Sequence, residues 1–327
     1  MKDISFIIPC YGSELTVRGV IEEIHSVMLE KKDISYEIIA VNDHSPDNVY
    51  NVLEELALSD LNLKILNFSR NFGKHSAIMA GYRLSNGNIV VNLDDDGQCP
   101  IDKIWDLIAP LENGHDIAIA KYPHKTQSAL KNLGSKLNEL MAVVLINKPK
   151  TLSLSNFCAI KRYVVDEIIK YNNPYAYLDG LFLRTTSNVA NVLMEERERT
   201  AGKGNYTFIK SLSLWLNGFT AFSVKPLRIA TFTGMFCAFI GFLVGCIMII
   251  RKFINPNIAA GYTSMIAVIL FIGGLLMLML GLVGEYIGRI YICINNSPQY
   301  VIRDKINVNE YISTSESVEY MKERDIL

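Results

Sequence analysis

The stretch VVNLDDDGQCP, residues 90–100, decides the fold of this chain, because within it an apolar run gives way to a cluster of acids. Residues 89–93, IVVNL, form a short and mostly apolar run that is typical of a buried parallel strand. Carboxylates follow directly where that strand would end. In an open α/β sheet, ligands bind in the crevice at the carboxyl ends of the strands. The stretch therefore predicts a ligand site at that edge, with a solvated acidic turn as the alternative, since Asp is common in turns.

The acids have the spacing of a cation site. Asp94 and Asp96 are two residues apart, so their side chains can point the same way, and Gln98 adds a neutral oxygen on that side. Ligand sets made only of oxygen favour Mg²⁺ or Mn²⁺ over zinc. We therefore predict that Asp94, Asp96 and Gln98 bind Mn²⁺ or Mg²⁺.

The composition excludes several classes of protein. The chain has 327 residues, enough for one large domain or two, and a formal net charge of −1. Because it lacks a global basic field, we expect no nucleic-acid partner. The six cysteines form no CxxC pair, which argues against a zinc site or a disulfide framework and favours a reducing compartment. Nothing resembles a cleavable signal peptide, so we expect the N-terminal domain on the cytoplasmic side.

Strand patterns alternate with helical patterns along the N-terminal part of the chain. This alternation is typical of an α/β, doubly wound and mostly parallel sheet. Ser13 is the predicted N-cap of the first helix. No GxGxxG follows the first strand and no GxxxxGK[ST] is present, so neither a dinucleotide-binding Rossmann domain nor a phosphate loop is expected. The predicted strands are Ile4–Ile8, Tyr36–Val41, Leu63–Phe68, the run that ends before Asp94, and Asp116–Ala120.

Polar residues stand where several of these strands end. Asp43 follows the second strand, Arg70 and Lys74 follow the third, and Lys121 follows the fifth. Each alone could be a turn residue or a solvated charge, but their joint occurrence predicts one shared site. The residues predicted to line this site are Pro9, Tyr11, Glu14, Asp43, Arg70, Lys74, Asp94, Asp95, Asp96 and Lys121.

The C-terminal part of the chain contains two long uncharged stretches. Ile229–Ile250 and Tyr262–Gly284 are each long enough to cross about 30 Å of hydrocarbon as a helix, and Arg251–Gly261 is the short connection. The excess of Lys and Arg at the outer ends favours a hairpin with both ends in the cytoplasm. A pair of buried helices in a soluble core is the alternative.

The segment between sheet and hairpin has two features. Tyr206–Val224 places apolar residues, Trp215 among them, on one helical face, which favours a helix lying on the bilayer surface over a helix packed in the core. Before it, Arg197, Arg199 and Lys203 form a glycine-containing basic loop. Such a loop beside a membrane is suited to a lipid phosphate, although an ordinary solvated loop has the same composition.

Five motifs resemble those of one enzyme family. Asp43 lies in NDHSPD, and SRNFGKHSAIMAGY resembles RNxG(K/Q)xxAxxAG. LDDDGQCP is similar to DxDxQxPP, and RTAGKGNY is similar to RxxGxSKY. GEYIGRIY, residues 284–291, resembles the exit from the second membrane span. Together these motifs resemble the family-2 glycosyltransferases of GT-A fold that load polyprenyl phosphates, which include dolichol-phosphate mannose synthases and bactoprenol glucosyl and aminoarabinosyl transferases.

The resemblance assigns roles to individual residues. It implies that Asp43 reads the base and ribose of a nucleotide diphosphate sugar, that the metal motif binds the diphosphate, and that Asp94, Asp96 and Arg199 are catalytic. Relatives have an Asp where this chain has Asn156, and Gly204 and Asn205 replace a Ser-Lys pair, whose charge Lys203 would supply. Asp179 is the one carboxylate left that could act as a base on the acceptor side. The predicted acceptor-phosphate residues are Lys131, Ser135, Asn156, Asp179, Arg197, Arg199 and Lys203.

The resemblance thus implies a metal-dependent, inverting glycosyltransferase with Mn²⁺ or Mg²⁺ as cofactor. It would move a sugar from a UDP-sugar to undecaprenyl phosphate, for cell-surface glycans such as O-antigen or lipopolysaccharide. The alternatives are a transferase that extends a glycan at a hydroxyl group and a membrane-anchored subunit that binds nucleotide sugars without catalysis. The expected partners are the donor, the lipid acceptor and the bilayer, and a homo-oligomer is compatible with the sequence.

The predicted architecture has four parts in a bacterial inner membrane, with a multi-pass anchor and a cytoplasmic catalytic domain. They are a GT-A catalytic domain (1–205), an amphipathic juxtamembrane segment (206–228), a two-helix transmembrane hairpin (229–289, with helices at about 229–250 and 262–287) and a cytoplasmic C-terminal tail (290–327).

Overall fold

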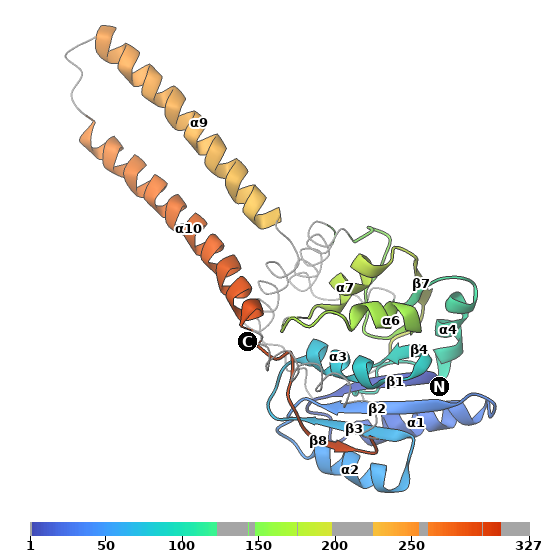
Figure 1. Ribbon diagram of the computed structural model, residues 1–327. Helices are drawn as coiled ribbons and strands as arrows, with labels where there is room; N and C mark the ends of the chain where they lie inside the picture. The colour runs from blue at the N-terminus through green and yellow to red at the C-terminus, as the bar shows by residue number, and fades with distance from the viewer. Residues whose placement is uncertain are drawn as a thin grey trace, which may run out of the picture. The chain divides into compact units, whose positions relative to one another are not determined.

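The structure is a computed structural model in which the chain forms two units. The first unit contains residues 1–127, 149–205 and 298–327, and the second contains residues 128–148 and 206–297. The first unit carries the sheet and the second carries two long helices (Figure 1). The structure describes residues 2–122, 143, 148–174, 176–197, 225–254, 261–295 and 297–308.

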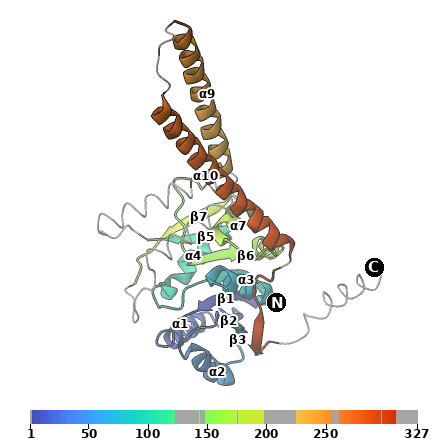
Figure 2. The same ribbon diagram turned by 90° about the vertical axis from the view of Figure 1, so that its left-hand side faces the viewer.

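One mixed sheet of eight strands forms the centre of the first unit, in the order β7-β5-β6-β4-β1-β2-β3-β8 (Figures 1 and 2). Strands β1 to β5 and β7 run in one direction, while β6 and β8 run antiparallel to their neighbours. The mostly parallel α/β sheet predicted from the sequence is confirmed. The strands are β1 (Lys2–Cys10), β2 (Tyr36–Asn42), β3 (Leu63–Phe68), β4 (Gly87–Asn92), β5 (Ile117–Lys121), β6 (Cys158–Lys161), β7 (Val189–Leu193) and β8 (Ile302–Ile306).

Helices cover both faces of this sheet, as Figure 1 shows. Ile4, Phe6 and Ile8 of β1 alternate toward one face and join a buried cluster with α1, α2, η1 and α4. On the other face α3 packs so closely on β1 that a Cβ atom at Gly81 would lie 2.5 Å from a side-chain carbon of Ile7. The helices of the first unit are α1 (Val17–Leu29), α2 (Val49–Ser59), α3 (Lys74–Leu84), the 3₁₀ turn η1 (Ile101–Lys103), α4 (Ile104–Glu112), α6 (Arg162–Ile168) and α7 (Leu178–Thr185).

The start of α1 differs from the sequence-based expectation. The helix begins at Val17, with Thr16 as its N-cap and no side-chain hydrogen bond at the cap. The predicted N-cap, Ser13, instead accepts hydrogen bonds through its backbone carbonyl from the N–H groups of Thr16 and Val17, both at 3.0 Å. The prediction of Ser13 as the cap was therefore wrong, because a tight turn precedes the helix.

Residues 298–308 return to the sheet after α10. Strand β8 pairs antiparallel with β3, so that Ile65 lies opposite Ile306 and Phe68 opposite Ile302. The exposed side chains of β8 are charged, as is common in edge strands that avoid further pairing. The predicted boundary at residue 290 therefore does not describe residues 298–308, which belong to the first unit.

The second unit contains α9 (Lys225–Ile254) and α10 (Tyr262–Ile294). Within α10, Phe271–Ile294 is long enough to cross a membrane and has a mean hydropathy of 1.8, whereas the apolar stretch of α9, Ala230–Leu243, is shorter. Of the residues that the structure describes, one helix and not two therefore meets the length and composition of a span. This finding does not support the predicted multi-pass anchor. The predicted surface helix (Tyr206–Val224) lies outside the described residues.

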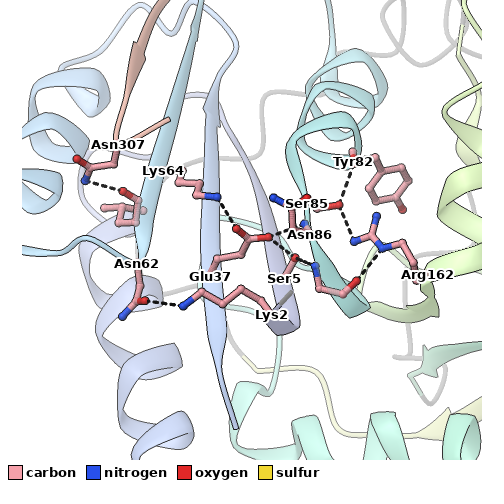
Figure 3. Close-up of polar contacts among 12 residues, drawn as sticks. Lys2, Ser5, Glu37, Asn62, Lys64, Tyr82, Ser85, Asn86, Arg162 and Asn307 are labelled. Carbon is pink, nitrogen blue, oxygen red and sulfur yellow. Dashed lines mark hydrogen bonds and ion pairs between the residues drawn. The ribbon is translucent and has the colours of Figure 1, made fainter. Parts of the chain in front are cut away.

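A buried carboxylate joins the strands at the end of the sheet opposite to their carboxyl ends (Figure 3). Glu37 of β2, whose residue is 1% exposed, accepts hydrogen bonds from Ser5 Oγ and Lys64 Nζ, each at 2.6 Å, and from the backbone N–H of Asn86 at 2.7 Å. Ser5 Oγ in turn accepts a hydrogen bond from the N–H of Gly87 at 2.8 Å. Glu37 thus joins β2 to β1 and β3 directly, and the link to β4 runs through Asn86 and Ser5.

We expect Glu37→Gln to destabilise the fold in a pH-dependent manner. Burial raises the pKa of Glu37, but hydrogen bonds from Lys64, Ser5 and the Asn86 backbone outweigh burial and hold the pKa below its usual value. A carboxylate whose pKa is lower in the folded state stabilises the fold at pH values above its unfolded-state pKa. This stabilisation is lost as the pH falls through the folded-state pKa. Thermal and denaturant unfolding of the detergent-solubilised protein should show a loss of about 2–3 kcal/mol at pH 7 that shrinks below about pH 4.

The control for this prediction is Glu167→Gln, which breaks an exposed pair with Lys170 and should change stability by less than about 0.5 kcal/mol. A destabilisation by Glu37→Gln that is the same at pH 7 and pH 3.5 would contradict the electrostatic origin.

Candidate active site

The side chain of Asp94 is the point where three predicted site residues meet. Asp94 follows β4, and its Oδ1 atom forms an ion pair with the ammonium group of Lys74 at the start of α3. Its Oδ2 atom accepts a hydrogen bond from the side-chain amide of Asn156 at 3.2 Å. The structure therefore brings together a predicted metal ligand, a predicted donor residue and a predicted acceptor residue at the carboxyl edge of the sheet.

The turn after Asp94 orients the other predicted metal ligands. Asp96 Oδ1 accepts a hydrogen bond from the N–H of Gln98 at 3.1 Å, and Gly97 between them has a φ of 75°, which favours glycine. The side-chain amide of Gln98 donates to the carbonyl of Arg197 at 3.3 Å, which leaves its oxygen as an acceptor. Carboxylate and amide oxygens are ligands that Mg²⁺ and Mn²⁺ accept, with substrate phosphates and water completing the shell.

This donor set fits a divalent cation that is shared with a diphosphate. Within the described residues, no cluster of three or more His, Cys, Asp and Glu side chains is placed to hold a metal. Two carboxylates and an amide suit a metal that takes its remaining ligands from a substrate. Asp94 and Asp96 stay on the accessible side of the turn and are each only half-buried.

Asp95 contacts the loop after β1. Its Oδ2 atom accepts a hydrogen bond from the N–H of Tyr11 at 2.9 Å, and its carbonyl accepts one from Thr16 Oγ1 at 2.6 Å. Burial raises the pKa of Asp95 to about 6, with a smaller contribution from the neighbouring charge of Asp94. Asp95 thus ties the acidic turn to the loop after β1, while the Tyr11 side chain remains exposed.

Asp43 holds the loop that follows β3. Its two carboxylate oxygens accept hydrogen bonds from the N–H groups of Phe72 at 2.6 Å and Gly73 at 2.8 Å, and its carbonyl accepts one from the Asn71 side chain at 3.2 Å. The residue is 3% exposed, and burial raises its pKa to about 6 although the two N–H groups oppose that shift. The structure thus shows Asp43 ordering this loop, and its predicted contact with a base and ribose remains a prediction.

The loops after β1 and β2 are joined by a second set of contacts. The N–H of Gly12 donates to Ser45 Oγ at 2.8 Å, and the N–H of Glu14 donates to Asp47 Oδ2 at 2.9 Å. The Glu14 carboxylate accepts from the N–H of Asn48 at 3.1 Å. Glu14, predicted to line the site, therefore makes these contacts between the two loops.

The other predicted donor residues lie at the ends of their strands. Arg70 is exposed, with its guanidinium carbon 4.6 Å from the centre of the Phe72 ring. Pro9 is buried in β1, paired with Val41 of β2. Lys121 ends β5 and is half-buried, and its carbonyl accepts a hydrogen bond from the N–H of Met194 at 3.0 Å.

Two of the predicted acceptor residues have structural partners. Arg197 donates from one guanidinium nitrogen to both oxygens of Glu23, at 2.8 and 2.9 Å, and from another to Asp102 at 2.5 Å. Asp179 is half-buried in the first turn of α7 and, together with burial, raises the pKa of Tyr177. The remaining predicted residues, Lys131, Ser135, Arg199 and Lys203, lie outside the described residues.

His75 is a residue near the site that the sequence analysis did not single out. Burial lowers its pKa to about 4, with a smaller effect from the Lys74 charge, so the imidazole is neutral at pH 7. Its ring lies edge-on to that of Tyr177, with centroids 5.6 Å apart. The only signal in the sequence was its position directly after Lys74 in the first turn of a helix.

Residues 5–169 match the family described as Glycosyl transferase family 2, and residues 225–290 match the description GtrB C-terminal hairpin. The chain belongs to glycosyl transferase family 2. This glycosyltransferase is 33% identical over 305 residues to the SfII prophage-derived bactoprenol glucosyl transferase of Shigella flexneri, covering 92% of this chain and 97% of that protein. The family membership, the GT-A fold and the enzyme class predicted from the sequence are confirmed.

Other similar proteins include an undecaprenyl-phosphate 4-deoxy-4-formamido-L-arabinose transferase of Proteus mirabilis, which is 29% identical over 317 residues, covering 95% of this chain and 96% of that protein. Among solved structures, glucosyl-3-phosphoglycerate synthase from Mycobacterium tuberculosis in complex with Mn²⁺, uridine-diphosphate-glucose and phosphoglyceric acid is 17% identical, with a TM-score of 0.49. The match covers 68% of this chain and 79% of that one.

We expect Arg197→Ala to affect stability more than acceptor binding, because its guanidinium is already paired with Glu23 and Asp102. Unfolding experiments should show a loss of about 1 kcal/mol, a value reduced by the partial exposure of these pairs. The apparent KM for the lipid acceptor should change by less than about twofold.

The matched control is Glu23→Gln, and the double variant should lose less stability than the sum of the two single variants. A tenfold rise in the acceptor KM with unchanged stability would instead assign Arg197 to the acceptor.

Proposed function

We propose that this glycosyltransferase moves a sugar from a nucleotide diphosphate sugar, a UDP-sugar, to undecaprenyl phosphate with inversion at the anomeric carbon. The observation that carries the proposal is the convergence of Lys74, Asp94 and Asn156 at the carboxyl edge of the sheet. The names of the bactoprenol glucosyl transferase and of the undecaprenyl-phosphate transferase support the choice of acceptor.

On the donor side, the chain would supply metal ligands, a positively charged side chain and loops that are already ordered. Asp94, Asp96 and Gln98 would hold Mn²⁺ or Mg²⁺, which when bound neutralises charge on the leaving diphosphate. Lys74 adds a positive charge beside Asp94 and would bind a phosphate oxygen of the donor. Asp43 and Asp95 fix the surrounding loops before substrate arrives, so little ordering remains at the moment of reaction.

On the acceptor side, the chain needs no proton acceptor. The second pKa of a phosphate monoester is near 6, so at pH 7 the lipid phosphate is mostly a dianion and already a competent nucleophile. Asn156 donates its amide hydrogen to Asp94, whereas a carboxylate at this position would repel both Asp94 and the incoming dianion. Asn156 therefore suits a phosphate acceptor better than a sugar hydroxyl, which must lose its proton during attack.

The membrane segments support a location at the bacterial inner membrane. The apolar stretch of α10 is long enough to span, and the match to a C-terminal hairpin favours α9 as its partner. We propose that the catalytic domain and both termini are cytoplasmic. After replacement of the native cysteines, a cysteine at Asn257 should react with an impermeant reagent in whole cells and one at Ser315 should not. The reverse pattern would place the site away from cytoplasmic nucleotide sugars.

The decisive experiment is an assay of the purified full-length enzyme with a panel of UDP-sugars and undecaprenyl phosphate. Formation of a lipid-linked monosaccharide supports the proposal. Transfer only to glycan hydroxyl groups would favour the elongating alternative, and donor binding without transfer would favour a binding subunit.

We expect divalent cations to be essential for transfer. EDTA should abolish turnover and Mn²⁺ or Mg²⁺ should restore it, because the leaving diphosphate carries charge that the protein alone compensates poorly. Asp96→Asn should lower kcat at least about 100-fold, a loss typical of a major electrostatic contribution to the transition state. Full activity of the EDTA-treated wild-type enzyme would exclude the metal assignment.

We also expect Asp179 to be dispensable as a base. Asp179→Asn should retain turnover within about tenfold, or roughly 1.4 kcal/mol in the barrier, while Asp96→Asn loses more. Activity should fall as pH drops below about 6, because the acceptor phosphate then gains a proton, and this acid limb should be unchanged in Asp179→Asn. A thousandfold loss, or an acid limb that moves with the substitution, would mean that a protein base operates.

A further inference from the structure

The loop that carries Arg70 and Lys74 contacts the C-terminal end of the described chain. We define the donor loop as residues 69–74 and the C-terminal segment as residues 299–307, which follow α10 in the sequence. The N–H of Ser69, the first residue of the donor loop, donates to the carbonyl of Val301 at 3.0 Å. Tyr300 stacks on Phe68, directly before the loop, with ring centroids 5.2 Å apart and planes 8° apart.

The stacked pair continues into the donor loop through a third ring. Phe72 lies edge-on to Phe68, with centroids 5.7 Å apart, and Arg70 lies over the face of Phe72 at 4.6 Å. Contacts of this kind contribute beyond simple burial because aromatic rings prefer specific mutual orientations. A continuous path of side-chain contacts thus leads from Tyr300 to Arg70, opposite the hydrogen bonds that Asp43 makes to Phe72 and Gly73.

The C-terminal segment also holds the far end of α3, the helix that begins at Lys74. Arg83, in the last turn of α3, donates to Gln299 Oε1 at 2.9 Å and lies 5.3 Å from the centre of the Tyr300 ring. Gln299 is 5% exposed, and its amide donates to the carbonyl of Asn173 at 2.8 Å. The C-terminal segment therefore contacts the last turn of α3 through Arg83 and the chain before α3 through Phe68 and Ser69.

The segment is itself anchored to the sheet at its other end. The Asn307 side-chain amide lies within 2.9 to 3.1 Å of the carbonyls of Ala57, Asp60 and Leu63 (Figure 3 shows Asn307 beside β3). Asp304 accepts a hydrogen bond from the Asn67 amide at 2.9 Å. The residues that contact the donor loop, Tyr300 and Val301, thus directly precede a strand that is itself anchored to the sheet.

We infer that the C-terminal segment positions the donor loop, with Tyr300 as the central positioning residue. Tyr300 stacks on Phe68, which packs edge-on against Phe72, and it acts through these rings on the backbone that places Arg70 and Lys74. The inference rests on the proposed function in one respect, since it takes residues 69–74 as the part of the site that binds the donor. It predicts that changes in residues remote from the acidic turn alter donor affinity without altering the chemistry.

The test compares Tyr300→Ala with Tyr300→Phe, which keeps the stacked ring, and with Lys305→Ala, an exposed substitution in the same C-terminal segment. Hydrogen exchange of the full-length protein should be faster at the amides of residues 69–73 in Tyr300→Ala alone. The Kd for UDP with Mn²⁺ and the donor KM should rise about fivefold, as expected from loss of an aromatic pair, while the acceptor KM and kcat stay within about twofold.

Several outcomes would overturn the inference. These are unchanged exchange of residues 69–73 in Tyr300→Ala, an equal effect of Tyr300→Phe, or a fall in kcat at unchanged donor affinity. If Tyr300→Ala does not fold, hydrogen exchange of the wild-type protein with and without UDP and Mn²⁺ tests the inference instead. Coupling between two sites is reciprocal, so UDP with Mn²⁺ should slow exchange in β8 as well as in the donor loop, and protection of the loop alone would refute the inference.

This design separates the inference from the proposed function. If wild-type protein neither binds UDP nor uses any UDP-sugar, the proposed donor is wrong. The exchange of residues 69–73 in the ligand-free variants then still shows whether Tyr300 orders the loop.

Discussion

The site depends on buried carboxylates that accept hydrogen bonds from the backbone of neighbouring loops. Polar loops at the end of a parallel sheet expose N–H groups that no strand partner can satisfy, and each unpaired group would cost free energy. Asp43 satisfies Phe72 and Gly73, and Asp95 satisfies Tyr11. Because these residues link the loops after β1, β2, β3 and β4, the groups that face the substrate are held in place before any ligand binds.

Carboxylates at the two ends of the sheet give opposite dependences of folding stability on pH. Burial raises the pKa of Asp43 and Asp95 to about 6, so the folded chain binds these protons more tightly than the unfolded chain, and their contribution to stability falls as pH rises from about 4 to 6. Glu37, at the other end of the strands, has a lowered pKa and contributes in the opposite direction. The two ends of the sheet thus respond to pH with opposite sign.

The sequence was sufficient to predict the part of the fold in which strands and helices alternate. Strands β1 to β5 were expected near their observed positions because each is an apolar run, and β1 to β4 are each followed by a turn and a helix. Strand β6 has only four residues, and β8 carries three charged residues among five, so neither shows a strand pattern in its sequence. Their pairing is decided by distant partners, which a local pattern does not contain.

The sequence was sufficient to predict which loops form the candidate site. It was not sufficient to predict the role of each acidic residue within a loop. The run DDD in the sequence does not show that Asp95 binds the N–H of Tyr11 while Asp94 pairs with Lys74, because both partners lie in loops distant in sequence. The role of Arg197 could not be predicted from the sequence either. Its charge suggested a phosphate ligand, whereas the fold places it between Glu23 and Asp102, far away in sequence.

The position of β8 in the chain adds a constraint on how the site is completed. Asn67 and Asp304 are 237 residues apart in sequence, and α9 and α10 lie between them, so β3 gains its outer partner only after both long helices have been synthesised. Contacts between residues so distant in sequence form late, since they require closure of a long loop. The contacts that Tyr300 makes to Phe68 and Val301 makes to Ser69 are therefore available only to a chain that continues past both long helices.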